Sequence, residues 1–463
     1  MKPSAATGLA NERLAELLRL VGWRPEAFAR RINIALAECR STRRVHEQTP
    51  YKWLARGEVP HGEVPELVVD ILSRALDVDL DYEDVWHTDR QRPRLPMHAD
   101  HAMDLRWDGR GLLSLLGGSV PTRRTVFAVA GAALTGPAWN ALRRPAPGLV
   151  SAHGGRVSEP LLQMIEAVVA QAQQLDDQQG GAARDFVRDQ FNAVARLLRL
   201  GAYDTAGGRR LAAALAQLAQ TAGFMAFDAF EDGQAQRWYL IALRAAHAAD
   251  DRSLAASVLA LMSNQAADRG HALDALQLAS AAQEAAADAP TAVRSLVNAR
   301  SGLAHAAAGD LAGFTRMRDA TRGLLTTSPD RPLPRWASYV DGAELDAITG
   351  RGLVVLADHL PARRKQLLRQ ATPLLHTRAH SDAAGPARRS ALRHGAWLGL
   401  AHAAAGDLDQ AVTAARRALT HVPAVASVRS VALLHRLHDE LSPARDRRVR
   451  ELLRDLRRLP RRS

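Results

Sequence analysis

The sequence has little of what a covalent or metal framework requires, because its 463 residues include only one cysteine, Cys39. A single thiol excludes an intramolecular disulfide and any zinc site built on several thiolates, which fits a reducing cytoplasm. Residues 1–11 lack the apolar core that a secretory signal needs, so we expect no export by that route. We therefore predict a cytoplasmic protein without a bound cofactor.

The motifs of common enzyme classes are absent as well. The sequence has no phosphate loop of the Walker type, no HExxH zinc motif, no GxSxG nucleophile motif and no dinucleotide-binding fingerprint. His435, His438 and Asp439 could share a metal on one helix, but three loosely arranged ligands are a weak signal. We predict that the protein is not an enzyme and has neither catalytic nor metal-binding residues.

Lysine is scarce, because Lys2, Lys52 and Lys365 are the only ones and arginine supplies nearly all of the net charge of +12. Abundant arginine and alanine together are typical of GC-rich coding, which makes overall basicity weak evidence for nucleic-acid binding. The local distribution says more: residues 13–56 hold ten basic and four acidic residues, and residues 57–92 hold three and ten. One face of the N-terminal region can therefore meet an anionic partner while another avoids it.

Apolar periodicity predicts four or five short helices at the N-terminal end. Asn11 is suited to cap a first helix that stops at Gly22, and Pro25 is suited to the first turn of a second. Residues 65–76 and 81–86 have the pattern of a further helix and a last turn. Short helices with short links make an all-α domain.

The segment from Val45 to Gly57 is the most informative one. We expect a short helix over it, with Pro50 in the first turn and the glycine as its stop. Trp53 and Leu54 can supply its buried side, while polar side chains occupy the early turns. A recognition helix needs this division, because it offers polar groups to base edges and phosphates in the major groove.

Residues 93–155 change character, with scattered prolines and glycines and no sustained amphipathic period, and we interpret most of them as a linker. Within them, Arg123 and Arg124 precede an apolar run in a pattern that resembles a twin-arginine export signal. The pair lies more than a hundred residues from the N-terminus, and the run is shorter than the ~20 apolar residues that span a bilayer. We expect no membrane association.

Residues 156–441 are almost continuously helical in pattern and contain a repeated turn. Residues 304–311 and 401–408 have the same sequence, Ala-His-Ala-Ala-Ala-Gly-Asp-Leu. Looser versions occur at residues 200–204, 267–272 and 347–351. Small residues let two antiparallel helices approach and Gly-Asp makes the turn, so this region resembles degenerate tetratricopeptide repeats whose glycine spacing departs from ~34 residues. The arginine-rich residues 442–463 are interpreted as a capping helix and tail, with a second nucleic-acid contact as the alternative.

The first four predicted helices, with Lys52-Trp53, Gly57 and Val59-Pro60, resemble the XRE (lambda-repressor/Cro-like) helix-turn-helix. Together with the repeats, the whole chain is similar to actinobacterial regulators of that architecture, including the NsdA-like regulators of sporulation and antibiotic production. The resemblance implies base contacts from Gln48 and Lys52, with Glu47, Thr49 and Tyr51 as further candidates.

The link before this helix is longer than the usual tight turn of that family and contains Arg40, Arg43 and Arg44, which could hold phosphates. Arg56 is the remaining candidate. The alternative is that these arginines are a solvated charge run and that Lys52 is an ordinary surface lysine.

These observations predict an all-α protein with an N-terminal helix-turn-helix domain and a C-terminal helical-repeat solenoid. The predicted parts are a DNA-binding domain (1–92), a linker (93–155), repeats (156–441) and an arginine-rich tail (442–463). We expect a DNA-binding transcriptional regulator of the repressor type that works as a homodimer and whose repeat groove takes a peptide or protein ligand. The alternative is a protein-interaction scaffold whose N-terminal domain has lost DNA binding.

Overall fold

The fold is helical throughout the part of the chain that can be described. A computed structural model describes residues 11–38, 41, 43–76, 80, 82–86, 107–117, 128–326, 332–381 and 387–460. These residues form helices and a few isolated β-bridges but no β-strand. The predicted all-α fold is therefore confirmed.

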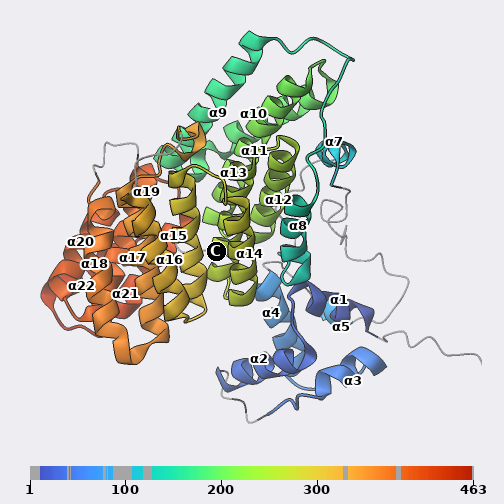
Figure 1. Cartoon of the computed structure of the whole chain (residues 1–463). Coiled ribbons are helices and arrows are strands. Elements are labelled where there is room, and N and C mark those ends of the chain that lie inside the picture. The colour runs from blue at the N-terminus through green and yellow to red at the C-terminus, as the bar shows by residue number, and fades with distance from the viewer. Residues whose placement is uncertain are drawn as a thin grey trace, which may run out of the picture.

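Five short helices form an N-terminal unit with a hydrophobic core of its own (Figure 1). They are α1 (Glu12–Leu20), α2 (Pro25–Glu38), α3 (Thr49–Arg56), α4 (Val64–Leu76) and α5 (Tyr82–Trp86). Asn11 caps α1 as predicted, because its side chain accepts a hydrogen bond from the Leu14 N–H at 2.9 Å. Gly22 follows α1 at a φ of +68°, a conformation that glycine adopts without strain. The core runs from Leu14 to Trp86.

The C-terminal region is an array of stacked helical hairpins (Figure 1). Its helices are α9 (Glu159–Gln179), α10 (Arg184–Leu200), α11 (Thr205–Asp228), α12 (Asp232–Ala248), α13 (Arg252–Asp268), α14 (Ala272–Ala285), α15 (Thr291–Ala307), α16 (Leu311–Leu325), α17 (Gly342–His359), α18 (Arg364–Ala379), α19 (Arg388–Ala405), α20 (Leu408–Leu419) and α21 (Val428–Leu441). Short 3₁₀ turns cover Gly181–Ala183, Arg335–Ala337, Pro361–Arg363 and Val422–Ala424. Helices α11 and α12 form one hairpin, and each of the next four pairs up to α19 and α20 forms another. This arrangement is a helical-repeat solenoid.

The two identical octets make the same turn. Gly309 and Gly406 adopt left-handed φ values of +70° and +83°, which end α15 and α19. Asp310 and Asp407 then cap the next helices, each accepting a hydrogen bond from the N–H three residues on, at 2.9 Å and 3.2 Å. The predicted Gly-Asp turn is confirmed at both positions.

The break predicted around Gly350 is wrong, because α17 runs through this glycine without interruption. A Cβ at Gly350 would lie 2.8 Å from Leu375 Cγ and 3.1 Å from the Ala371 carbonyl oxygen, both on α18. The glycine therefore serves close packing between two helices and not a turn.

Part of the predicted linker is built into the large core. Two helices lie there, α7 (Gly109–Gly117) and α8 (Ala132–Arg143). Trp107, Leu112 and Leu134 are buried among residues of the repeats. The prediction of a linker over 93–155 thus needs correction for its described residues, because short apolar segments pack on a neighbouring surface that their own periodicity does not reveal. The pair Arg123-Arg124 lies outside the described residues.

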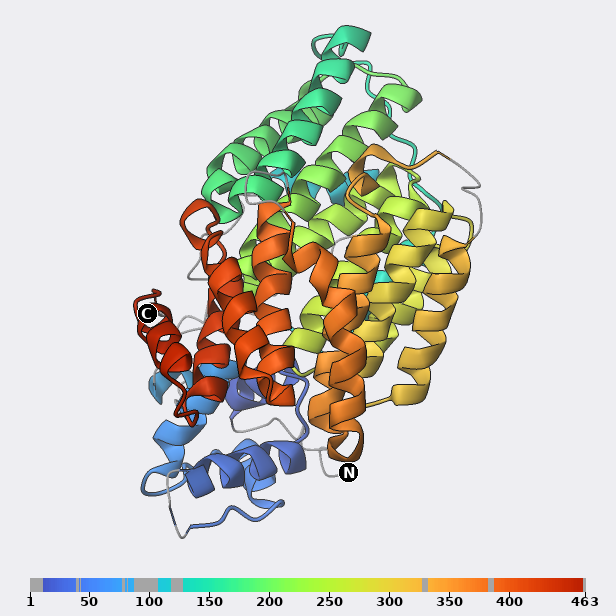
Figure 2. The same cartoon turned by 90° about the vertical axis from the view of Figure 1, so that its left-hand side faces the viewer.

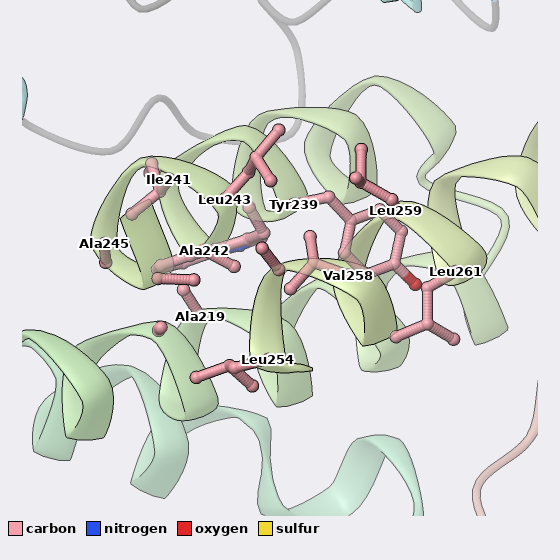
Figure 3. Packing of buried hydrophobic residues seen from close by; sticks show 14 of the residues in the cluster. Ala219, Tyr239, Ile241, Ala242, Leu243, Ala245, Leu254, Val258, Leu259 and Leu261 are labelled. Atoms are coloured by element: carbon pink, nitrogen blue, oxygen red, sulfur yellow. The ribbon is translucent and has the colours of Figure 1, made fainter. Parts of the chain in front are cut away.

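The core of the first repeats is packed around α12 and α13. Tyr239 is fully buried, and a Cβ at Gly223 on α11 would come within 2.7 Å of its ring. Figure 3 shows part of this cluster, in which Tyr239 and Leu243 from α12 lie in one layer with Val258 from α13. A missing side chain on one helix thus makes room for a large ring on the next.

The array curls until its beginning meets its end. Arg389 on α19 donates to Asp176 on α9 at 2.5 Å and to Asp177 at 3.0 Å. Ser427, next to α21, donates to Asp228 on α11 at 2.8 Å. Burial works against the charge of Arg389, but these facing carboxylates raise its pKa above the ordinary value. The inner face of the solenoid is therefore enclosed by charged contacts.

The chain ends on an amphipathic helix, α22 (Arg447–Arg457), that packs against α20 and α21. Its buried side chains are Val449, Leu452, Leu453 and Leu456. Most of its arginines remain on the outer side, and Arg448 lies 2.8 Å from Asp409 of α20. The helix covers the apolar face of the last repeat, as a capping helix does.

None of the helices in the described ranges combines the length and the apolar character that a membrane crossing requires. Within the same residues, no three histidine, cysteine, aspartate or glutamate side chains are grouped to hold a metal ion. Of the three candidate ligands considered above, His438 lies 3.0 Å from Asp439, and a ring nitrogen of His435 lies 3.0 Å from the Pro460 carbonyl oxygen.

Candidate nucleic-acid interface

Helix α3 is fixed to the N-terminal unit through one face. Trp53 is only 3% exposed, and its ring packs edge-on against Phe28 of α2 and Trp86 of α5, with centroid distances of 6.4 Å and 5.6 Å. Pro50 lies in the first turn, and Gly57 closes the helix at a φ of +66°. Aromatic pairs of this geometry contribute beyond the area they bury. The sequence therefore predicts the buried side and the end of α3 correctly.

The beginning of α3 differs from the prediction, because the helix starts at Thr49 and not at Val45. Val45 lies in neither a helix nor a turn and is 8% exposed, and the side chain of Asn33 on α2 holds its backbone. Asn33 Nδ2 donates to the Val45 carbonyl oxygen and Asn33 Oδ1 accepts from the Val45 N–H, both at 2.8 Å. These two bonds replace those that a helix would make, so residues 43–48 form a pinned link instead of a further helical turn.

Two of the predicted contact residues are tied to α2. Tyr51 Oη donates to Glu26 Oε1 at 2.5 Å, and this hydrogen bond lowers the pKa of the Glu26 carboxyl and raises the pKa of the tyrosine. Glu47 lies 3.5 Å from Arg30. Both side chains are exposed, but each already has a partner on the neighbouring helix. They orient α3 relative to α2.

The predicted arginines have different surroundings. Arg43 donates to the His61 carbonyl oxygen at 2.7 Å and lies 3.8 Å from Glu63, so it connects the link to the loop before α4. Arg44 donates to the Arg43 carbonyl oxygen at 3.0 Å, and Arg56 lies 3.4 Å from Glu58. Exposed pairs of this kind contribute little and exchange easily for other partners. Arg40 lies outside the described residues.

Gln48 and Lys52 are the open positions of the segment. Both are exposed, and among the described residues neither side chain has a hydrogen-bond or ion-pair partner. Gln48 is the N-cap residue of α3 and has a helical backbone conformation, and Lys52 lies four positions on, so the two side chains lie on the same side of the helix. Thr49 lies beside them, partly buried at the first position of α3. One exposed side of the helix thus presents an amide and a cation to solvent.

Sequence reasoning missed Asn33 and Arg30, which hold the link and Glu47 in place. The signal for Asn33 is a polar residue directly after Ile32, a buried member of the apolar stripe of α2. Such a polar group needs a partner, but the sequence does not say which backbone supplies it.

A short segment ties this unit to the repeats. In residues 128–131, which we call the strap, Val129 exchanges two hydrogen bonds with the Gln236 side chain of α12, at 2.7 Å and 2.9 Å. Ala130 donates to the Leu20 carbonyl oxygen at the end of α1, at 2.9 Å. Figures 1 and 2 both place the N-terminal unit at one end of the molecule (Figure 2). In Figure 1, α3 lies on the side of the unit that faces away from the repeats. The repeats therefore fix the unit and leave α3 uncovered.

Comparison with known families gives one match, over residues 14–85, to the model described as the SP15 N-terminal domain. No curated protein and no solved structure matches the chain. The matched range coincides with the first hydrophobic core, which runs from Leu14 to Trp86. Sequence similarity and packing thus delimit the same unit.

Proposed function

We propose that the protein is a DNA-binding transcriptional regulator that places α3 in the major groove of duplex DNA. The observation that carries this proposal is the exposed pair Gln48 and Lys52, at the N-cap and the fourth position of a helix that Trp53 anchors to the unit. The Gln48 amide can pair with adenine, and the Lys52 ammonium can bind guanine or a phosphate, so these two residues offer both base contacts and a phosphate contact. Arg44 and Arg56 flank it as phosphate contacts.

The dimensions of α3 suit this role. A helix of eight residues is ~12 Å long, and the major groove is ~12 Å wide, so one face can reach the base edges. Residues 13–56, which include α3, also carry an excess of positive charge. Phosphate neutralisation by the exposed arginines among them supplies affinity, and the side chains of Gln48 and Lys52 supply sequence preference.

The resemblance to XRE regulators with helical repeats supports the wider proposal. On that basis the protein acts in the cytoplasm, as a repressor of genes of development or secondary metabolism in an actinobacterium. A homodimer would present two α3 helices to half-sites one helical turn apart, ~34 Å. The repeats serve as the sensor or interaction domain.

Selection of bound sequences from a genomic fragment library tests the proposal. The full-length protein should enrich a common motif, and Gln48→Ala should relax the preference at the base it contacts. Gln366→Ala is a matched control, because Gln366 is exposed on α18, far from α3 in the fold. Loss of enrichment in both variants, or no enrichment by the wild type, contradicts the proposal.

A second candidate is a protein-interaction scaffold that has kept the N-terminal fold without DNA binding. The observation in its favour is that Tyr51, Glu47 and Arg43 are held by partners within the unit. This scaffold would show no affinity for duplex DNA even at low salt, where the electrostatic contribution is largest.

A further inference from the structure

The inner face of the repeats contains a charged groove of about 240 Å³ between the inner helices α11, α13, α15, α17, α19 and α21. Four arginines line it, Arg351, Arg393, Arg429 and Arg436, against two aspartates, Asp228 and Asp268. Phe224 and Trp397 contribute apolar walls. A groove of this composition has an excess of cations at an otherwise apolar surface.

The two aspartates are already engaged. Asp268 receives a hydrogen bond from Arg429, which also donates to Asp232 at 3.2 Å. Asp228 accepts from the hydroxyl of Ser427 at 2.8 Å, and burial raises the pKa of its carboxyl. Neither carboxylate lies within 4.0 Å of Arg351 or Arg393, although Asp268 acts on Arg351 and Asp228 on Arg393 through their charge.

Two of the four arginines donate hydrogen bonds directly to carboxylates. Arg429 donates to Asp268 and Asp232, and Arg436 donates to Asp358 at 2.6 Å. Arg393 has only a share of one: it lies 3.3 Å from Glu344, and Arg378 lies 3.2 Å from the same carboxylate. The Nε of Arg393 is buried without a hydrogen-bond partner among the described residues.

Arg351 has no carboxylate within 4.0 Å among the described residues. Its only hydrogen bond with them runs from Nη2 to Asn264 Oδ1 at 2.6 Å. Burial, together with the like charges of Arg393 and Arg300, lowers the pKa of Arg351 to about 9, although the charges of Asp268 and Glu344 act in the opposite direction. The neighbouring Arg300 donates to the Tyr339 hydroxyl at 2.9 Å, and its Nη1 is buried without a hydrogen-bond partner in the described part of the chain. Among the described residues, Glu344 is the one carboxylate that lies within 4.0 Å of any of these three arginines, which come from α15, α17 and α19.

Such an arrangement is unfavourable for the empty protein, because a buried cation without an anion is strongly destabilising. We infer that the groove binds a small molecule with an oxyanion head, a carboxylate or a phosphate, held by Arg351 and Arg393 with its apolar body against Phe224 and Trp397. This inference deepens the proposed sensor role and rests on it only for its biological meaning, since binding is measured without DNA.

Calorimetric titration of the full-length protein with sodium hexanoate, inorganic phosphate and hexan-1-ol tests the site. Hexanoate supplies head and body, phosphate supplies another head, and hexan-1-ol is the neutral analogue. We expect at least one anion to bind and hexan-1-ol to bind at least about tenfold more weakly than hexanoate, because hydrogen bonds to charged groups are the stronger ones. The tighter anion identifies the head group. Failure of both anions to bind at millimolar concentration overturns the inference.

Arg351→Gln keeps a donor for Asn264 and removes the charge, and it should weaken anion binding about tenfold or more. Arg351→Lys should restore part of the affinity. Arg369→Gln is the control, since Arg369 is exposed on α18 and no carboxylate among the described residues pairs with it. Equal anion affinity in the Arg351→Gln and Arg369→Gln variants contradicts the inference.

A thermal melt without ligand separates binding from support of the fold. If Arg351 binds a ligand and destabilises the protein without one, the Arg351→Gln variant should melt at the wild-type temperature or higher. A lower melting temperature in this variant, with anion affinity unchanged, assigns Arg351 to the fold and overturns the inference. Lys52→Ala leaves the groove intact, so anion binding and DNA binding fail independently.

Discussion

Removal of the Asn33 side chain should release the link that positions α3. Asn33 makes two hydrogen bonds of 2.8 Å to the backbone of Val45, and Asn33→Ala leaves the Val45 N–H and carbonyl without these partners. An unsatisfied buried group costs about 1–3 kcal/mol, and the site is partly buried, so we expect about 2–3 kcal/mol in total. The link and the first turn of α3 should open more often by the corresponding factor, about 30- to 150-fold.

Hydrogen exchange of the full-length protein measures this opening directly at the amides of α3. Asn33→Asp should give an intermediate rate, because a carboxylate still accepts from the Val45 N–H but cannot donate to its carbonyl. Ile34→Ala is the control, since Ile34 is 60% exposed at the next position of the same helix. Exchange of the α3 amides at the wild-type rate in Asn33→Ala would refute the reasoning.

Three further predictions concern the strap, a buried histidine and the repeat turn. Gln236→Ala removes both side-chain bonds to Val129, and hydrogen exchange in the strap should accelerate while the repeat core keeps its protection. Burial lowers the pKa of His394 to about 4, and the pKa of Glu344, which faces it, is also lowered. As the pH falls, these groups are therefore protonated in the unfolded chain before they are protonated in the folded protein. Because of His394, the free energy of unfolding should fall by about 3 kcal/mol between pH 6.5 and 4, and denaturant melts of His394→Gln should lack this loss. Gly406→Ala should lower the free energy of unfolding by about 1–2 kcal/mol, because alanine is strained at a φ of +83°. The added Cβ meets nothing within 4 Å, so the effect comes from the backbone and not from a clash.

Each of these has an outcome that contradicts it. Unchanged exchange in the strap of Gln236→Ala would mean that other contacts hold it. The same pH dependence in wild type and His394→Gln would show that other groups control acid stability. Gly323→Ala, an exposed helical glycine with open space around it, should stabilise by up to about 1 kcal/mol; equal effects at positions 323 and 406 would remove the backbone explanation.

Local features of the fold could be predicted from the sequence. The Asn11 cap, the Trp53 anchor and the turns at Gly309 and Gly406 follow from residue type and spacing, and the structure has them where expected. Gly350 was misinterpreted because a packing glycine and a turn glycine look alike without knowledge of the neighbouring helix.

Contacts distant in sequence could not be predicted. Arg389 and Asp176 are separated by 213 positions, and no periodicity relates them. At the site, the exposure of Gln48 and Lys52 could be predicted from the helix pattern. The partners that hold Tyr51 and Arg43 could not, because they come from α2 and the loop before α4, and only the packing of the unit brings these together.

The salt dependence of DNA binding by the full-length protein tests the central claim most directly. The logarithm of the binding constant should fall linearly with the logarithm of salt concentration, and Lys52→Ala should reduce the slope by about 1. Lys365→Ala removes the same charge from an exposed position on α18 and should leave the slope unchanged. Absence of binding at low salt, or equal slopes for the two lysine variants, would contradict the account.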